Sequence, residues 1–247
     1  MDAREEHHNS GTAGEDETRD CSARNNLLTF HAKLGLVKLK AIIFDLDGTI
    51  LDNEEVYARA ICAVLKRREI SCEEVKHTSG IGVEENWVKM KADLGLREDP
   101  KSLASETEKF YLEHLGEVKV RPGFRELVHF LRREGIKVLL STSSIRETAG
   151  LVLDTLKLGG LFDAKTFGDE VSRKKPAPDL FLKALQKEGL LPSQVLIIED
   201  SPSGVSAGKA ALTKTWVIKT ERFTRNELAQ ADRVVGSFLE LKNLLRT

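Results

Sequence analysis

The sequence of 247 residues contains no apolar run that approaches the roughly 18 residues needed for a membrane-spanning helix. It also has no excess of charge of one sign, because 38 Lys and Arg face 39 Asp and Glu, a formal net charge of −1. A chain without net positive charge is not drawn to nucleic acid by its bulk electrostatics. We therefore expect neither a membrane nor a nucleic acid as a partner.

Cysteine is scarce as well. The three cysteines, Cys21, Cys62 and Cys72, are odd in number and scattered, with the spacing of neither a disulfide framework nor a zinc site. This pattern predicts free thiols in a reducing compartment, and hence a cytoplasmic protein.

Large apolar residues are absent from the N-terminal stretch. Between Met1 and Leu27 there is no Val, Ile, Leu, Phe, Trp or Tyr, and residues 2–25 contain seven acidic residues. Such a segment cannot bury enough apolar area to offset its ordering entropy. It has neither the apolar core of a secretory signal nor the basic character of a transit peptide. We expect residues 1–38 to form a disordered acidic extension.

Beyond this extension, short apolar runs alternate with segments of helical periodicity. The runs rich in branched residues predict buried strands at Lys40–Asp45, Lys137–Thr142, Ala164–Gly168, Val195–Glu199, Thr215–Lys219 and, more weakly, Arg233–Val235. Helices are predicted at Gly123–Glu134, Arg146–Leu156, Pro178–Glu188 and Ser203–Leu212. Strands that alternate with helices indicate a doubly wound, Rossmann-like α/β fold with a parallel sheet.

Some 90 residues between the first two strands break this alternation and have helical patterns only, at about Glu54–Arg68, Val83–Leu94 and Ser102–Leu115. A simple crossover between parallel strands needs little more than a dozen residues. We therefore predict a helical cap at residues 54–118, inserted into a catalytic core made of residues 39–53 and 119–247. Trp87 and Tyr111 are expected to pack inside the cap, and Cys62 is expected in its core.

Charged and hydroxyl side chains gather where the predicted strands end. The first strand ends in Asp45-Leu46-Asp47-Gly48-Thr49, the second in Ser141-Thr142-Ser143-Ser144 and the fourth in Glu199-Asp200, while Lys175 follows the third. In open α/β sheets the carboxyl ends of the strands form the ligand site. Carboxylates crowded there repel one another unless a cation lies among them, and a donor set of oxygens alone favours Mg²⁺.

In this order these motifs resemble the haloacid dehalogenase superfamily, in the branch of phosphatases and phosphomutases that carry a helical cap. The resemblance covers about residues 39–245. It implies that Asp45 is the nucleophile and Asp47 the general acid and base, while Thr142 and Lys175 hold phosphoryl oxygens. It also implies that Mg²⁺ is held by Asp45, the Asp47 carbonyl oxygen, Glu199 and Asp200.

Residues beside these motifs are expected to contact the substrate. They are Gly48 and Thr49 in the first motif, and Ser144 and Arg146 on the loop after Thr142. An Arg146 guanidinium would pair with a second anionic group of the substrate, although a solvated residue in the first turn of a helix is an equally good interpretation.

Two residues near the helix after Asp200 carry structural expectations. Ser203 is predicted to cap the start of this helix. Leu212 stands where many relatives have glycine, so it would carry strain if its φ is positive.

The resemblance leaves the reaction open between two enzymes. Mutases similar to beta-phosphoglucomutase have a histidine where this chain has Tyr57, and a cap-loop arginine that residues 78–83 lack. We therefore predict a Mg²⁺-dependent phosphatase that hydrolyses a small phosphorylated metabolite, a sugar phosphate or similar compound, through an aspartyl-phosphate. The alternatives are a phosphomutase and a non-catalytic binding protein.

Overall fold

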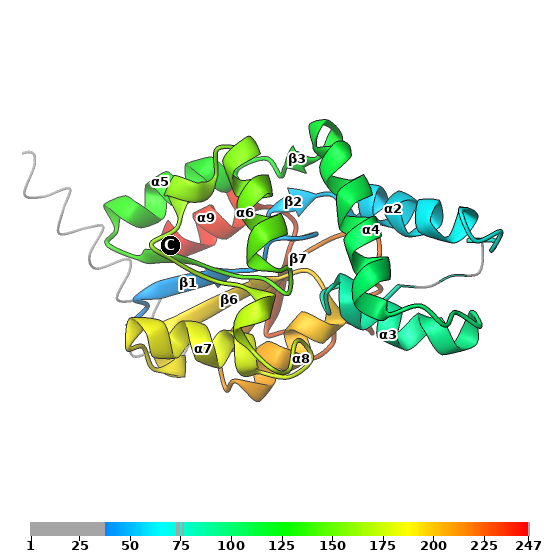
Figure 1. Cartoon of the computed structure of the whole chain (residues 1–247). Coiled ribbons are helices and arrows are strands. Elements are labelled where there is room, and N and C mark those ends of the chain that lie inside the picture. Colours follow the sequence, from blue (N-terminus) through cyan, green and yellow to red (C-terminus); the bar gives the residue numbers. More distant parts are fainter. Residues whose placement is uncertain (1–37, 73–74, 76, 247) are drawn as a thin grey trace, which may run out of the picture.

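The computed structural model describes residues 38–72, 75 and 77–246 (Figure 1), so the predicted N-terminal extension lies almost wholly outside the described residues. One sheet of six parallel strands has the order β5-β4-β1-β6-β7-β8. Its strands are β1 (Ala41–Phe44), β4 (Lys137–Ser141), β5 (Ala164–Thr166), β6 (Val195–Glu199), β7 (Lys214–Ile218) and β8 (Arg233–Val235). The predicted doubly wound fold is confirmed.

Helices cover both faces of this sheet (Figure 1). Successive residues of β1 point to opposite faces, so Ile42 and Phe44 pack in one apolar cluster and Ala41 and Ile43 in the other. The first cluster includes α5 (Phe124–Arg133), α6 (Arg146–Thr155) and α9 (Phe238–Arg246), and the second α7 (Asp179–Glu188) and α8 (Pro202–Ala210). Helix α9 is missing from the sequence prediction. None of the helices in the described residues could cross a membrane, because none is both long and apolar enough.

Three further helices lie together beyond one end of the sheet (Figure 1). They are α2 (Glu54–Lys66), α3 (Val83–Asp93) and α4 (Pro100–Glu113). As expected, Trp87 is fully buried among them, and its indole donates to Thr107 Oγ1 at 2.9 Å. Tyr111 is also fully buried, and its ring stacks on that of Tyr57 with centroids 4.0 Å apart. Trp87 lies with Ile61 and Leu103 in a separate apolar cluster inside the cap, whereas Tyr57 and Tyr111 belong to the cluster that continues into the core domain.

The chain enters and leaves this cap through two short strands that lie side by side. β2 (Leu51–Asp52) pairs antiparallel with β3 (Lys119–Val120). Both strands lie next to the boundaries predicted for the inserted domain. The chain thus enters and leaves the cap at one place, close to the loop that follows β1.

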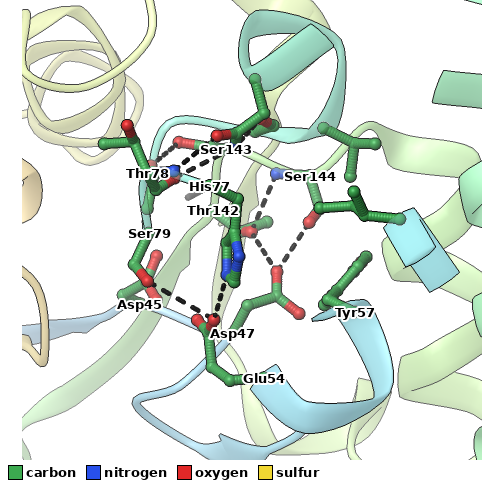
Figure 2. A pocket seen from close by; sticks show the side chains of 15 residues that line it. Asp45, Asp47, Glu54, Tyr57, His77, Thr78, Ser79, Thr142, Ser143 and Ser144 are labelled. Carbon is green, nitrogen blue, oxygen red and sulfur yellow. Dashed lines mark hydrogen bonds and ion pairs between the residues drawn. The ribbon is translucent and has the colours of Figure 1, made fainter. Parts of the chain in front are cut away.

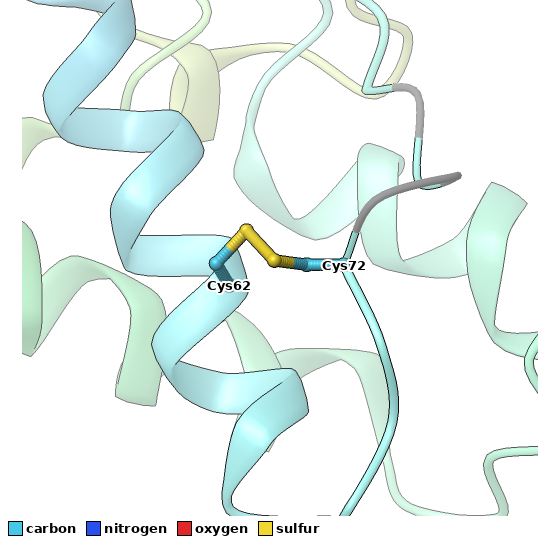
Figure 3. Close-up of a disulfide and its surroundings, with 2 residues drawn as sticks. All are labelled: Cys62 and Cys72. Carbon is cyan, nitrogen blue, oxygen red and sulfur yellow. A yellow bond between two sulfur atoms is a disulfide. The ribbon is translucent and has the colours of Figure 1, made fainter.

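The prediction of free thiols is wrong for two of the three cysteines. Cys62 on α2 and Cys72 in the loop after it form a disulfide (Figure 3), with their Cα atoms 5.3 Å apart. Cys62 is half-buried rather than a core residue. The separation of ten residues carries no framework signal, and only the turn that ends α2 brings the two sulfurs together. The inference of a reducing compartment thereby loses its support, while Cys21 lies outside the described residues.

Candidate active site

The predicted functional residues meet at the carboxyl ends of β1, β4 and β6. β1 lies between β4 and β6, so the loops that follow these three strands meet at the point where the strand order reverses. Side chains at this edge are almost completely inaccessible to solvent. Among the predicted site residues there, those exposed by no more than 3% include Asp45, Thr142, Lys175, Glu199 and Asp200. The fold thus brings together residues that are up to 155 positions apart, as the sequence pattern predicted.

Lys175 forms ion pairs with two of these carboxylates. Its Nζ contacts Asp45 Oδ1 and lies 2.6 Å from Glu199 Oε1. Burial by itself would lower the pKa of Lys175, but the two carboxylates raise this pKa overall, so the ammonium stays charged. For Asp45, burial is the largest influence and raises the pKa well above its ordinary value, while Lys175 acts in the opposite direction. The carboxylate of Asp45 therefore depends on neighbouring positive charge.

Asp45, Glu199 and Asp200 form a cluster that is suited to a metal ion. One carboxylate oxygen from each lies within 4.8 Å of the others. In the metal-free protein, burial and the negative charge of Glu199 raise the pKa of Asp200 to about 7. A divalent cation would relieve this crowding, and donors that are all oxygens suit a hard ion. The donor set therefore fits the predicted Mg²⁺.

Two glycines make room for this cluster. A Cβ on Gly204 in α8 would collide with the carboxylate of Glu199. A Cβ on Gly48 would collide with Asp200 Oδ2, and Gly48 also has a φ of +79°, which favours glycine. The carboxylates can therefore approach the backbone at these two places only because no side chain is present.

Asp47 has different neighbours from Asp45, although only one residue separates them. Its Oδ1 accepts from Asn53 Nδ2 at 2.6 Å. Its Oδ2 accepts from Ser144 Oγ at 2.6 Å and more weakly from Thr142 Oγ1 at 3.4 Å (Figure 2). Burial raises the pKa of Asp47, and the hydrogen bonds from Ser144 and Asn53 offset only part of this rise. Such a carboxyl retains its proton to a higher pH than an exposed one, as a general acid must.

A pocket adjoins both aspartates. The cap contributes one wall through α2, α3 and the loop before α3, and the core contributes the other through the loop after β4 (Figure 2). Its apolar lining comes from Tyr57, Ile61 and Val83. Its polar lining comes from Asp45, Asp47, Glu54, His77, Thr78, Ser79, Asn86, Thr142, Ser143 and Ser144. A pocket with this mixture of apolar, hydroxyl and carboxylate groups is suited to a small polar molecule.

Of the four predicted substrate contacts, only Ser144 lines this pocket. Arg146 pairs instead with Glu170 at 2.7 Å and stacks over the ring of Phe167, because α6 turns its first residue away from the cap. Thr49 is fully buried and donates to Asp200 Oδ1 at 2.9 Å, so it supports the metal-site cluster. The Gly48 amide donates to Asn53 Oδ1 at 3.0 Å and is not directed at a ligand. The structure thus places these three residues outside the lining of the pocket, and their contact with the substrate stays a prediction.

The start of α8 also differs from the prediction. Ser201, not Ser203, is the N-cap, and its Oγ accepts from the amide of Gly204 at 3.1 Å. The helix begins at Pro202, one residue earlier than expected, which moves the capping position forward. Ser203 Oγ instead donates to the carbonyl oxygen of Ser79 in the cap, at 2.6 Å.

Several residues at the site carry no recognisable sequence signal. Asn53 bridges Asp47 and the hydroxyl of Tyr111, which it contacts at 2.8 Å. The carboxylate of Glu54 lies 3.1 Å from His77 Nε2 and forms an ion pair with Arg222 Nη1 at 2.8 Å. Asn53 and Glu54 follow the first motif closely, so their proximity was foreseeable. The proximity of Arg222 was not foreseeable, because this residue lies on a separate loop after β7.

This geometry agrees with comparisons with known proteins. The family model of haloacid dehalogenase-like hydrolases matches residues 39–211. The chain belongs to this family. Its match to the family spans the first strand, the cap, Lys175 and the Glu199-Asp200 pair, so the resemblance inferred from the motifs is confirmed.

Individual relatives include enzymes named as phosphatases. A phosphorylated carbohydrates phosphatase of Thermotoga maritima is 32% identical over 70% of this chain and 82% of its own length. Protein CbbY of Rhodobacter capsulatus is 30% identical over 79% of this chain and 92% of its own length. The crystal structure of a hydrolase from Pseudomonas syringae is 27% identical with a TM-score of 0.75, covering 83% of this chain and 97% of that one. This haloacid dehalogenase-like hydrolase is a phosphoric monoester hydrolase that acts on phosphorylated small molecules.

Proposed function

We propose that this hydrolase is a Mg²⁺-dependent phosphatase that removes phosphate from a small sugar phosphate through an aspartyl-phosphate on Asp45. The observation that carries the proposal is that Asp45 and Asp47 line one pocket from a shared loop yet have different partners. Lys175 neutralises Asp45, whereas uncharged donors surround Asp47.

These surroundings support two chemical roles. Asp45 Oδ attacks phosphorus, and the P–O bond to the leaving group breaks as Asp47 gives its proton to the leaving oxygen. Asp47 then removes a proton from the water that hydrolyses the aspartyl-phosphate, which regenerates both carboxyl groups. Bound Mg²⁺ would offset the repulsion between a dianionic phosphate and the Asp45 carboxylate. Asp45, Glu199 and Asp200 are the side chains that would hold it.

The lining of the pocket favours a substrate with a single anionic group. None of its fifteen described lining residues is Lys or Arg, and its one imidazole, that of His77, lies 3.1 Å from the carboxylate of Glu54. A second phosphate or a carboxylate would be buried here without a cation to pair with it, which is costly. A neutral, hydroxylated group could instead hydrogen-bond to Glu54 and Ser79.

The same feature weighs against the phosphomutase alternative. A mutase passes through a bisphosphorylated intermediate, so its pocket must accept a phosphate at the end remote from the nucleophile. Tyr57 stands where the mutases have a histidine. It stacks on Tyr111 and has no imidazole for proton transfer. These observations support hydrolysis over isomerisation.

Phosphate release and product analysis with a substrate panel test the proposal. The purified protein is incubated with Mg²⁺ and, in separate reactions, a hexose monophosphate, the matching hexose bisphosphate, phosphoglycolate and p-nitrophenyl phosphate. We expect phosphate release with the monophosphate at the highest kcat/KM, and none from Asp45→Asn. Isomerisation without phosphate release would establish a mutase. A lack of turnover across the panel would favour a binding protein.

A further inference from the structure

Two loops and the start of one helix of the core hold the cap loop that lines the pocket. Ser143, after β4, donates to the carbonyl oxygen of Gly80 at 2.5 Å. Ser203, at the start of α8, donates to the carbonyl oxygen of Ser79 at 2.6 Å. Arg222, after β7, donates from Nη1 to Ser79 Oγ at 2.7 Å. The cap is therefore closed over the pocket, and Arg222 is one of the side chains that hold it there.

Arg222 also reaches into the carboxylate cluster. Its Nη2 contacts Asp200 Oδ2, while its Nη1 lies 2.8 Å from Glu54 Oε1 at the start of the cap. The side chain is 28% exposed, so most of it is shielded from solvent. One residue thus connects a ligand of the proposed metal site with two residues of the cap, Glu54 and Ser79.

Arg222 occupies a carboxylate that a metal ion at the cluster would also bind. Both oxygens of Asp200 are engaged, Oδ1 by the hydroxyl of Thr49 and Oδ2 by the guanidinium. In the described part of the chain, the ion pairs to the three clustered carboxylates come from Lys175 and Arg222. Two side-chain cations offset part of the negative charge, so the guanidinium on Asp200 reduces the attraction that this carboxylate would exert on a divalent ion.

We propose that Arg222 acts through Asp200. Its guanidinium competes with the divalent ion for this carboxylate and thereby weakens Mg²⁺ binding. When Arg222 releases Asp200, Glu54 and Ser79 remain as its partners in the cap. Binding at the metal site and closure of the cap are thus linked through one guanidinium. This inference rests on the proposed function, since it requires a divalent site at the cluster.

The opposite role for Arg222 gives the opposite result. If the guanidinium orients Asp200 toward the ion, its removal would weaken Mg²⁺ binding, because Asp200 would lose its fixed position. If Arg222 competes, its removal tightens binding. The sign of the change in Mg²⁺ affinity therefore distinguishes the two roles without any measurement of catalysis.

Calorimetric titration of Mg²⁺ into the full-length protein, without substrate, tests the proposal. Arg222→Gln keeps a donor near Glu54 and Ser79 but removes the charge, and we expect its Mg²⁺ dissociation constant to fall about tenfold. Arg222→Lys keeps the charge and should stay close to wild type. Arg59→Gln is the matched control, because Arg59 forms a surface pair with Glu117 at 2.5 Å, and its affinity should not change.

Unchanged or weaker Mg²⁺ binding by Arg222→Gln would overturn the proposal, as would equal tightening in Arg222→Lys. Melting temperatures in EDTA check that each variant is folded. Asp200→Asn separates this inference from the proposed function. If the wild type binds Mg²⁺ no better than Asp200→Asn, the metal site itself is wrong. If it binds better but Arg222→Gln does not tighten binding, only the role of Arg222 fails.

Discussion

At the scale of single residues, the site depends on what surrounds two similar acids. Asp45 is paired with an ammonium and lies in the carboxylate cluster, whereas Asp47 accepts hydrogen bonds from an amide and a hydroxyl. Positive charge favours the ionised form of a carboxyl group, and burial favours its neutral form. Burial raises the pKa of both acids, so Asp45 would attack as a carboxylate only with Lys175 and a bound cation beside it, whereas Asp47 would retain a proton to transfer.

Asp45→Asn should abolish turnover while leaving the fold intact. The amide keeps the size of the side chain but cannot attack phosphorus, so we expect kcat to fall by at least about a thousandfold. Lys175 would still have Glu199 as a partner, at 2.6 Å, so no buried cation would be left unpaired. Phosphate release measures the effect, and Asp52→Asn, an exposed acid nearby, is the control. More than a tenth of the wild-type rate in Asp45→Asn would contradict a covalent mechanism.

Leu212→Gly should stabilise the protein. Leu212 follows α8 with a φ of 56°, so the strain anticipated from the sequence is present, and its side chain is 85% exposed and contributes little burial. Relief of the left-handed conformation outweighs the entropy that glycine adds to the unfolded chain, and we expect a gain of about 0.5–1 kcal/mol.

Thermal unfolding measures this gain. Leu191→Gly is the matched control, because Leu191 is also exposed but has a φ of −88°, so glycine there should lower the melting temperature. Equal losses in both variants would show that positive φ at Leu212 carries no cost.

At the scale of secondary-structure elements, the cap is reinforced where its first helix ends. The Cys62–Cys72 disulfide ties α2 to the loop that leads toward His77 and Ser79 in the pocket wall. The same helix carries Glu54 and Tyr57 at its other end. The disulfide therefore links two neighbouring segments that each line the pocket, helix α2 and the loop that follows it.

Cys72→Ser should destabilise the protein. Closing a loop of ten residues restricts the unfolded chain, and its loss should cost about 3 kcal/mol in the chain-entropy model. We expect a melting temperature lower by about 5–10 °C. Dithiothreitol should lower the melting temperature of the wild type to that of the variant and leave the variant unchanged. A wild type that is insensitive to reductant would contradict a stabilising disulfide.

At the scale of the whole molecule, stability, metal binding and pH are linked through the carboxylate cluster. In the metal-free protein, burial and Glu199 raise the pKa of Asp200 to about 7. A carboxyl whose pKa is raised by folding contributes stability below its ordinary pKa, and this contribution is lost as the pH rises through about 7. Metal binding requires the ionised form.

Mg²⁺ should therefore bind about tenfold more tightly at pH 8 than at pH 6, because Asp200 is mostly protonated at the lower pH. Over the same range the metal-free protein should become less stable. Calorimetric titration at the two pH values and melting curves in EDTA measure these effects, and Asp200→Asn should reduce both. An affinity that does not change with pH would contradict the raised pKa of Asp200.

Much of this molecule could be predicted from local sequence patterns. Strands buried on both faces are short runs of branched residues, and their order along the chain determines which loops meet at one edge of the sheet. Asp45, Thr142, Lys175, Glu199 and Asp200 were therefore predicted to converge, and they do. Helix α9 was missed, although Phe238, Leu241 and Leu245 are buried on one face.

Side-chain direction and contacts between distant loops were decided by the tertiary structure alone. Arg146 follows Thr142 closely in sequence but points to Glu170, because the rotation of α6 sets its direction. Arg222 carries no motif, yet the packing of the β7 loop against the cap places it on Asp200. Local sequence determines periodicity and strand ends through backbone geometry, whereas contacts of this kind depend on how separate elements pack, which local patterns do not encode.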